Sequence, residues 1–230
     1  MRSPNDSFYN FRADASALGG FLEEPFRRDI PTLAQVSLPP VGGFATTRSG
    51  AFNFEEVVSC SAAFTRISGQ QHLSDGTIAI QVASVIEDLN ILEVVTAKRI
   101  SSQISITIPP AGGLWQTSLA GSNFEGLKVA GRDEERVRDI YQRESAATDP
   151  RKGIGTYLCS VLERFEGEQA ISGRGLVVEL PEFGRFVFGE VRRSRDCLQL
   201  TAIRADLGCP VKGKISICAV GGGGSGDNKS

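Results

Sequence analysis

The single histidine of the chain, His72, lies in the polar segment GQQHLSDG. A Ser-His-Asp centre would require long-range folding to bring a nucleophile to this histidine, and the local sequence does not indicate one. We therefore interpret His72 as a solvated residue in a turn between two strands. One histidine cannot form a multi-histidine metal site, and the clustered acidic loop that calcium requires is absent. We expect no catalytic residue, no metal ion and no other cofactor.

A glycine-containing segment, Gly208–Lys214 (GCPVKGK), has the spacing of a phosphate-binding loop as far as its lysine. The next residue is Ile215, where that motif requires Ser or Thr. A phosphate-binding loop must also open a helix, whereas the sequence that follows, ISICAV, is typical of a strand. This pattern predicts a turn between two strands.

Carboxylate pairs could supply the acid and base of a glycosidase built on a sandwich. They occur at Glu23 and Glu24, at Glu55 and Glu56, and around Glu179, Glu182 and Glu190. Because no feature selects two of these residues, we interpret them as surface charge.

The only tryptophan, Trp115, lies in the glycine-flanked segment AGGLWQTSLAGS. If it is exposed, its ring could stack on a sugar or anchor a partner protein. A hairpin core residue is the other interpretation, and both stay open. Trp115 is the one candidate ligand-binding residue.

A basic cluster, Arg192, Arg193 and Arg195, follows three phenylalanines of the same segment. Aromatic and basic residues together can stack on and neutralise nucleic acid. The chain has 25 Lys and Arg against 27 Asp and Glu, for a net charge of -2. Since this balance supplies no field for an anionic partner, a sheet face with a charged rim is the better interpretation, and we expect no nucleic-acid partner.

Alternating apolar and polar residues predict a mainly β protein. The clearest strand is Thr96–Ile108, which ends at Pro109 and Pro110, and a second is Gly76–Ile86. Further strands are predicted at 11–22, 33–38, 57–66, 124–129, 157–165, 175–180, 185–193, 197–205 and 211–220. Short strands at regular spacing, separated by many of the 26 glycines, are typical of an antiparallel β-sandwich or a barrel-like fold.

One segment has helical periodicity. Residues 133–144 (DEERVRDIYQRE) carry acids in the first turn and an apolar stripe at Val137, Ile140 and Tyr141, which predicts a short amphipathic helix. The turn-rich residues 145–155 that follow are the best position for a subdivision of an otherwise single domain, 1–220. Residues 221–230 (GGGGSGDNKS) predict a flexible tail.

Five cysteines, an odd number without a CxxC pair, argue against a disulfide framework and against a zinc cluster. The last two predicted strands should form a hairpin around Asp206–Pro210. Counting outward from that turn places Cys197 opposite Ala219, one position from Cys218. A single bulge would bring the two thiols together, so Cys197 and Cys218 form a candidate disulfide in an oxidising compartment and neighbouring thiols in a reducing one.

No apolar run reaches the length of a signal sequence or of a membrane helix. We therefore expect no membrane span and a cytoplasmic location by default, with the cell surface as the alternative if a leader is missing.

Four stretches resemble uncharacterised bacterial β-rich proteins of the choice-of-anchor type. They are Val82–Ile100, Ser122–Gly131, Leu180–Val191 and Leu200–Gly213. The resemblance implies a β-rich and often surface-associated protein, and it carries no catalytic residue.

Together these patterns predict a non-enzymatic β-sandwich that acts through protein contacts, as an assembly subunit or as a surface or interaction module. Its partner would be a second copy of the chain or another protein. The alternative is a sandwich that binds or cleaves carbohydrate, in which case the partner is a glycan.

Overall fold

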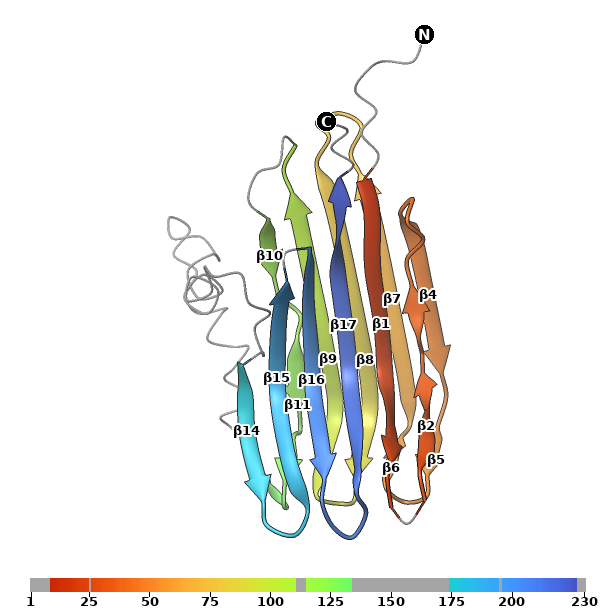
Figure 1. Cartoon of the computed structure of the whole chain (residues 1–230), viewed down its shortest axis with the longest axis vertical. Coiled ribbons are helices and arrows are strands. Elements are labelled where there is room, and N and C mark those ends of the chain that lie inside the picture. The colour runs from red at the N-terminus through yellow and green to blue at the C-terminus, as the bar shows by residue number, and fades with distance from the viewer. Residues whose placement is uncertain (1–8, 25, 111–114, 134–173, 195, 227–230) are drawn as a thin grey trace.

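Two antiparallel β-sheets make up the part of the protein that the computed structural model describes, residues 9–24, 26–110, 115–133, 174–194 and 196–226 (Figure 1). These residues contain 17 strands and no helix. The chain is therefore mainly β, as predicted.

Sheet A has seven strands. In order across the sheet they are β14 (Arg174–Leu180), β15 (Gly184–Ser194), β16 (Cys197–Leu207), β17 (Gly213–Gly226), β1 (Tyr9–Leu22) and β2 (Arg28–Leu33), with the short β3 (Val36–Ser37) also paired to β1. The first described strand thus lies beside the last, and both are central.

Sheet B has ten strands, of which the longest are β7 (Ala62–Gln71), β8 (Ile78–Ile91) and β9 (Val95–Ile108). On one side of this meander lie β4 (Gly43–Ser49), β5 (Phe52–Phe54) and β6 (Val58–Cys60). On the other side lie β10 (Gln116–Ser118), β11 (Asn123–Glu125), β12 (Lys128–Val129) and β13 (Arg132–Asp133).

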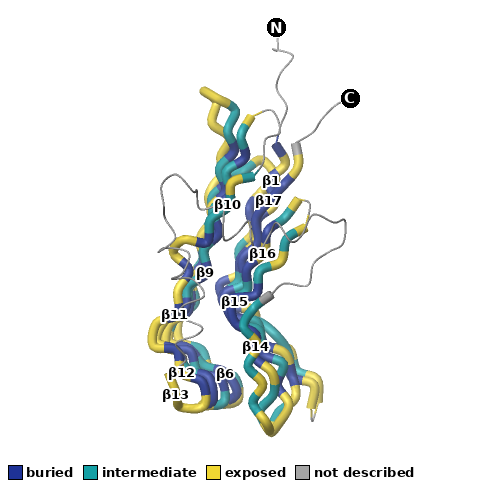
Figure 2. Tube along the Cα trace, turned by 90° about the vertical axis from the view of Figure 1, so that its left-hand side faces the viewer, coloured by how far each residue is buried: buried dark blue, intermediate teal, exposed yellow. Residues whose placement is uncertain are grey.

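The two sheets pack face to face, and the buried residues lie between them (Figure 2). Strands β16 and β17 lie over β8 and β9, and β1 lies over β7 and β8. The sheets do not close into a barrel, so the sandwich alternative is the one that the structure has.

Most strand predictions are confirmed. The strands predicted at 96–108 and 76–86 are β9 and β8, and Pro109 follows directly after β9 ends at Ile108. The predicted helix at 133–144 is not confirmed: Asp133 belongs to β13, and the remaining residues lie outside the described part of the chain. The predicted loop at 145–155 and strand at 157–165 also lie outside it.

Halfway along the strands of sheet A, the alternation of inward-facing and outward-facing side chains reverses. Because side chains alternate between the faces of a sheet, two adjacent buried residues mark a reversal of the alternation. Such pairs lie side by side at Ala17 and Leu18 in β1, Ile217 and Cys218 in β17, and Ala202 and Ile203 in β16. Cys218 (φ 48°) has a left-handed backbone, as does Gly189 (φ 64°) in β15. The pairs on either side of Cys218 keep one register, so no residue is inserted.

The alternation in sheet B reverses opposite the reversal in sheet A. Here the reversal is marked by two adjacent exposed residues instead of two adjacent buried ones. These are Glu87 and Asp88 in β8, and Lys98 and Arg99 in β9. Asp88 also has a left-handed backbone (φ 50°). Since one sheet gains an inward residue where the other gains an outward one, the two layers bend in the same direction (Figure 2).

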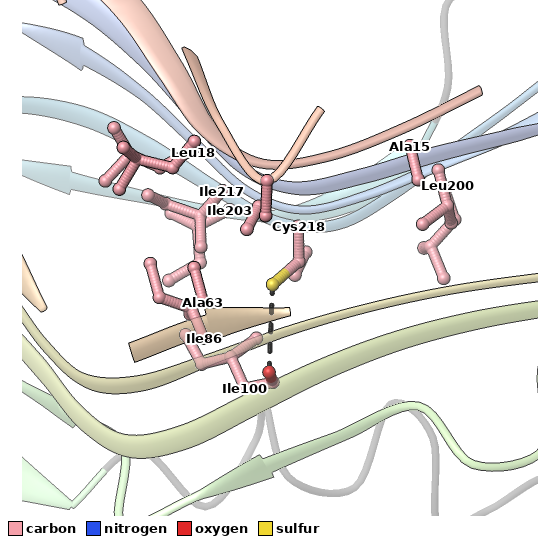
Figure 3. Close-up of a cluster of buried hydrophobic side chains, with 14 of the residues drawn as sticks. Ala15, Leu18, Ala63, Ile86, Ile100, Leu200, Ile203, Ile217 and Cys218 are labelled. Carbon is pink, nitrogen blue, oxygen red and sulfur yellow. Dashed lines mark hydrogen bonds between the residues drawn. The ribbon is translucent and has the colours of Figure 1, made fainter. Parts of the chain in front are cut away.

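Polar groups connect the sheets at this bend. The Cys218 thiol donates a hydrogen bond across the core to the Ile100 carbonyl, with a sulfur-oxygen distance of 3.7 Å (Figure 3). The Ser84 hydroxyl of sheet B donates to the Ser16 carbonyl of sheet A at 3.0 Å. Thr65, Ser84 and Ser102 lie opposite one another on adjacent strands and are fully buried. The bend therefore places a row of hydroxyls inside an otherwise apolar core.

The glycines expected to form a flexible tail are instead the end of β17. Gly221–Gly224 are buried, and they pair with β1 on one side and β16 on the other. Small residues are required here because a Cβ at Gly223 would lie 2.0 Å from the Asp196 carbonyl oxygen, and one at Gly222 would lie 3.1 Å from Ile106. The prediction of a tail from residue 221 was wrong, since neighbouring strands override the low strand propensity of glycine.

We predict opposite effects for two serines in the buried hydroxyl row. Ser84→Ala leaves the buried Ser16 carbonyl without its donor and should lower the free energy of unfolding by about 1–3 kcal/mol. Ser102→Ala removes a buried hydroxyl that has no hydrogen-bond partner, so the free energy should stay the same or rise. Urea denaturation of both variants measures this, and equal losses would contradict the assigned hydrogen bond.

We also predict that Gly223→Ala lowers the free energy of unfolding by about 1–3 kcal/mol, because the added methyl group meets backbone atoms of Asp196 and Cys197. The matched control is Gly50→Ala, where an added Cβ meets nothing within 4 Å, so its effect should stay within about 0.5 kcal/mol. Thermal unfolding followed by circular dichroism provides the comparison. A freely moving tail would give no difference between the two variants.

Candidate functional site

Two adjoining depressions hollow the outer face of sheet B. One, of about 550 Å³, lies over β4, β7 and β8, and the other, of about 440 Å³, lies over β8, β9 and β11. Val85 and Arg99 line both. We call the combined feature the outer groove and treat it as the candidate site.

The register of sheet B builds the floor of the outer groove from one residue of each strand. Arg48 lies opposite Phe64, Phe64 opposite Val85, and Val85 opposite Ser101, which in turn lies opposite Asn123. Phe64, Val85, Ser101 and Asn123 alternate with buried neighbours, and exposed Arg48 alternates with half-buried ones, so all five share the outer face. The groove therefore runs across the strands and joins residues from positions 48 to 123 of the chain.

One half of the outer groove combines apolar surface with positive charge. Phe64 is 39% exposed, an unusual fraction for a phenylalanine, and Val85 lies beside it. Arg48 and Arg99 flank these residues, and neither forms an ion pair with a described carboxylate. Glu87 is the one acid of this half and lies opposite Arg99 on the neighbouring strand.

The other half is polar, and several of its groups are already fixed. The Ser101 hydroxyl donates to the Gly121 carbonyl at 2.8 Å, and the Ser122 hydroxyl bonds to the backbone of Gln103 at 2.9 and 3.2 Å. Glu125 forms an ion pair with Lys98 at 2.8 Å, and this hydrogen bond lowers the pKa of the Glu125 carboxyl. Side-chain amides of Gln103 and Asn123 complete this half.

Trp115, the predicted ligand-binding residue, lies just before β10. It is partly buried, packs against the hydrophobic core and does not line the outer groove. The structure thus brings Phe64, rather than the tryptophan, to the hollowed surface.

The candidate disulfide between Cys197 and Cys218 does not form, and both residues are free thiols. The hairpin itself is confirmed as β16 and β17, but its strands meet at Leu207 and Gly213, so Cys197 lies opposite Gly223. Five residues of strand, about 17 Å, separate that position from Cys218, far beyond the reach of a disulfide. Burial also raises the pKa of the Cys218 thiol to about 12, which keeps it protonated and unreactive.

The remaining sequence candidates have structural roles. His72 is exposed in the turn between β7 and β8, as predicted. Glu190 is buried and binds Arg204 at 2.7 and 2.9 Å and Arg192 at 3.1 Å. Phe186 and Phe188 are fully buried, so they cannot stack on a nucleic-acid base beside these arginines.

Within the described residues, no group of three or more His, Cys, Asp or Glu side chains is arranged to hold a metal ion. The same part of the chain has no helix long and apolar enough to cross a membrane.

Sequence reasoning missed the outer groove. Phe64 falls inside the strand predicted at 57–66. Of its neighbours on the same face, Ala62 and Arg66, only Arg66 is a local sign that this face points outward. The register between strands places Arg48 opposite Phe64 and brings Arg99 of β9 into the same depression. Register is a long-range property that the sequence of a single strand does not reveal.

The fold and site define a β-sandwich with an open groove on the outer face of one sheet. A family model described as Domain of unknown function (DUF8256) matches residues 8–144. This match covers more than half of the chain, so the chain belongs to that family. No curated protein and no solved structure matches the chain.

We predict that a fragment ending at residue 144, the end of the family match, does not fold by itself. It keeps sheet B but loses β14–β17 of sheet A, which uncovers the buried isoleucines of β8 and β9. Circular dichroism should show no cooperative thermal transition, whereas the full chain should show one. A cooperative transition of the fragment near the melting temperature of the full chain would contradict this prediction.

Proposed function

We propose that the protein is a non-enzymatic interaction module that binds a partner protein in the outer groove of sheet B. The partner would present an exposed loop or extended segment with an apolar side chain flanked by carboxylates. The observation that carries this proposal is the combination in one groove of exposed Phe64 with Arg48 and Arg99, neither of which has an ion pair with a described carboxylate.

The apolar part of the groove supplies an anchor point. A phenylalanine with 39% of its surface exposed loses contact with water when a partner side chain covers it, and burial of apolar surface contributes roughly 25 cal/mol per Å². Aromatic and arginine residues at the centre of a patch are the common energetic hot spots of protein interfaces.

The charges of the groove select the partner. Arg48 lacks an ion pair with any described residue. Arg99 lies opposite Glu87 on β8 and Glu125 on β11, but Glu125 is already paired with Lys98 at 2.8 Å. An arginine binds a carboxylate with two parallel hydrogen bonds. The groove therefore favours an acidic segment over a basic one.

The role as an assembly subunit or surface module, which the sequence patterns predict, is part of the same proposal. Both roles require a protein-binding surface, and the outer groove meets that requirement.

Carbohydrate binding is the second candidate function, and the polar half of the groove favours it. The amides of Gln103 and Asn123 could bond to sugar hydroxyls, while the Phe64 ring offers a face for stacking. In this case the stacking residue would be Phe64 in place of Trp115, which lies outside the groove.

We predict that peptides selected from a random displayed library on the full chain carry an apolar residue flanked by Asp or Glu. Arg48→Glu and Arg99→Glu should each weaken the binding of such a peptide at least tenfold, because each replaces attraction by repulsion. Phe64→Ala should weaken it through the loss of the anchor. Fluorescence anisotropy of the labelled peptide measures the dissociation constants.

The matched control is Arg185→Glu, which makes the same charge change at an exposed position on β15 of sheet A and should leave the affinity unchanged. Equal weakening by the control, or unchanged binding by the three groove variants, would overturn the protein-binding proposal. A glycan array probed with the wild type and with Phe64→Ala tests the second candidate, which fails if no glycan is bound.

A further inference from the structure

Strand β4 forms a free edge of sheet B. Among the described residues it pairs with β7 on one side and with no strand on the other. Strand β5 continues the same edge beyond Gly50 and Ala51, because its pairing with β6 keeps the register of β4 with β7. A row of backbone N–H and C=O groups along β4 is therefore available for another strand.

The usual protections of an edge strand are weak here. Exposed edges commonly carry charges, proline or a bulge that prevent pairing between molecules. The seven residues of β4, GFATTRS, contain no proline and a single charge, Arg48. Phe44 adds apolar surface at this edge, since it is 58% exposed.

We propose that two copies of the chain pair through β4, antiparallel and around a twofold axis at Thr46. This pairing goes beyond the proposed function because it joins two copies through the backbone of β4, although the side chains of Thr46 and Arg48 also line the outer groove. Thr46 is the midpoint of Gly43–Ser49, so a twofold axis at this residue overlaps all seven residues of both strands. The result is one continuous sheet that spans both copies.

The side chains of β4 favour this register. Phe44, Thr46 and Arg48 share the outer face, and full overlap places Phe44 opposite the partner's Arg48. A contact of the same kind already exists within the chain, since the Arg66 guanidinium lies 5.3 Å from the centre of the Phe44 ring. A guanidinium over an aromatic face is attracted to the electrons of the ring. The twofold axis would create the contact twice.

Charge disfavours the slipped alternative. A shift by two residues along each strand would place Arg48 opposite the partner's Arg48, and like charges directly opposite destabilise a strand pair. It would also leave three paired residues, 47–49, in place of seven. The full overlap thus pairs the largest number of residues and avoids the repulsion between the two Arg48 side chains.

The chain also limits the pairing to β4. Pro39 and Pro40 precede the strand, and proline cannot donate a hydrogen bond to a neighbouring strand. At the other end, Gly50 and Ala51 interrupt the strand before β5. The structure therefore assigns a dimer interface of defined length, which makes its register testable.

Light scattering after size exclusion should give the full chain a mass of about 49 kDa, twice the 24.6 kDa of one copy. A mass of 24.6 kDa at the highest soluble concentration would overturn the proposal.

Single introduced cysteines test the register under mild oxidation in a background with Cys159→Ser and Cys209→Ser. Among the described cysteines Cys209 is the exposed one, and Cys159 lies outside the described residues. Thr46→Cys should form a covalent dimer, since residue 46 lies opposite itself across the axis. Phe44→Cys and Arg48→Cys should not form dimers alone, because four residues of strand, about 13 Å, separate each from its own copy. A mixture of these two variants should cross-link, since the positions are directly opposite.

If the protein is a dimer but Thr46→Cys does not cross-link, the pairing through β4 is overturned. If Arg48→Cys alone forms a covalent dimer, the proposed register is overturned in favour of the slipped register, in which residue 48 lies opposite itself. Circular dichroism of each variant confirms that its fold is intact. Peptide binding in the outer groove is measured separately, so failure of the dimer and failure of the proposed function give different results.

Discussion

The change of strand phase at the bend is the constraint on which the rest of the sandwich depends. Strands of 14 residues, such as β1, β8, β9 and β17, must keep one face buried along their whole length. Reversing the alternation in one sheet alone would turn half of its apolar residues toward water. Sheet A reverses at Cys218 and sheet B at Asp88, both through a left-handed residue, and each reversal lies against the other. The left-handed backbone costs roughly 1–2 kcal/mol per residue, which the continuous burial of the core on both sides of the bend offsets.

The same bend determines where the outer groove ends. The reversal in sheet B turns Asp88 and Lys98 outward beside Glu87 and Arg99. Asp88 accepts a hydrogen bond from the Ser61 hydroxyl at 2.6 Å, and Lys98 pairs with Glu125 at 2.8 Å. Glu87 and Arg99 line the outer groove whereas Asp88 and Lys98 do not, so the groove ends at the level of the bend and Phe64 and Val85 lie in its apolar half. The core and the candidate binding surface therefore share one structural cause.

Local sequence patterns were sufficient for most strands and insufficient for their arrangement. Ile100, Ile104, Ile106 and Ile108 alternate with polar residues, and this alone predicted β9 together with its end at Pro109. The glycines of β17 carry no such signal, because only the strands beside them hold them extended. The disulfide prediction failed for a related reason: the hairpin was correct, but a shift of four residues in its register moved Cys197 away from Cys218. The sequence likewise predicted that Phe64 lies in a strand. It could not predict that Arg48 and Arg99 line the same groove, because that depends on the register between strands.

The family match and the folding unit divide the chain differently. Every residue that lines the outer groove lies between positions 46 and 125, inside the matched segment 8–144. The strands that cover the opposite face of sheet B, β16 and β17, lie beyond that segment, and β17 pairs with β1 along nearly its full length. A groove built on β4, β7, β8, β9 and β11 keeps its shape only if the inner face of these strands is packed, because one sheet with an exposed apolar face is not stable by itself. The binding surface is thus encoded within the family segment, whereas its rigidity comes from strands that follow it in the chain.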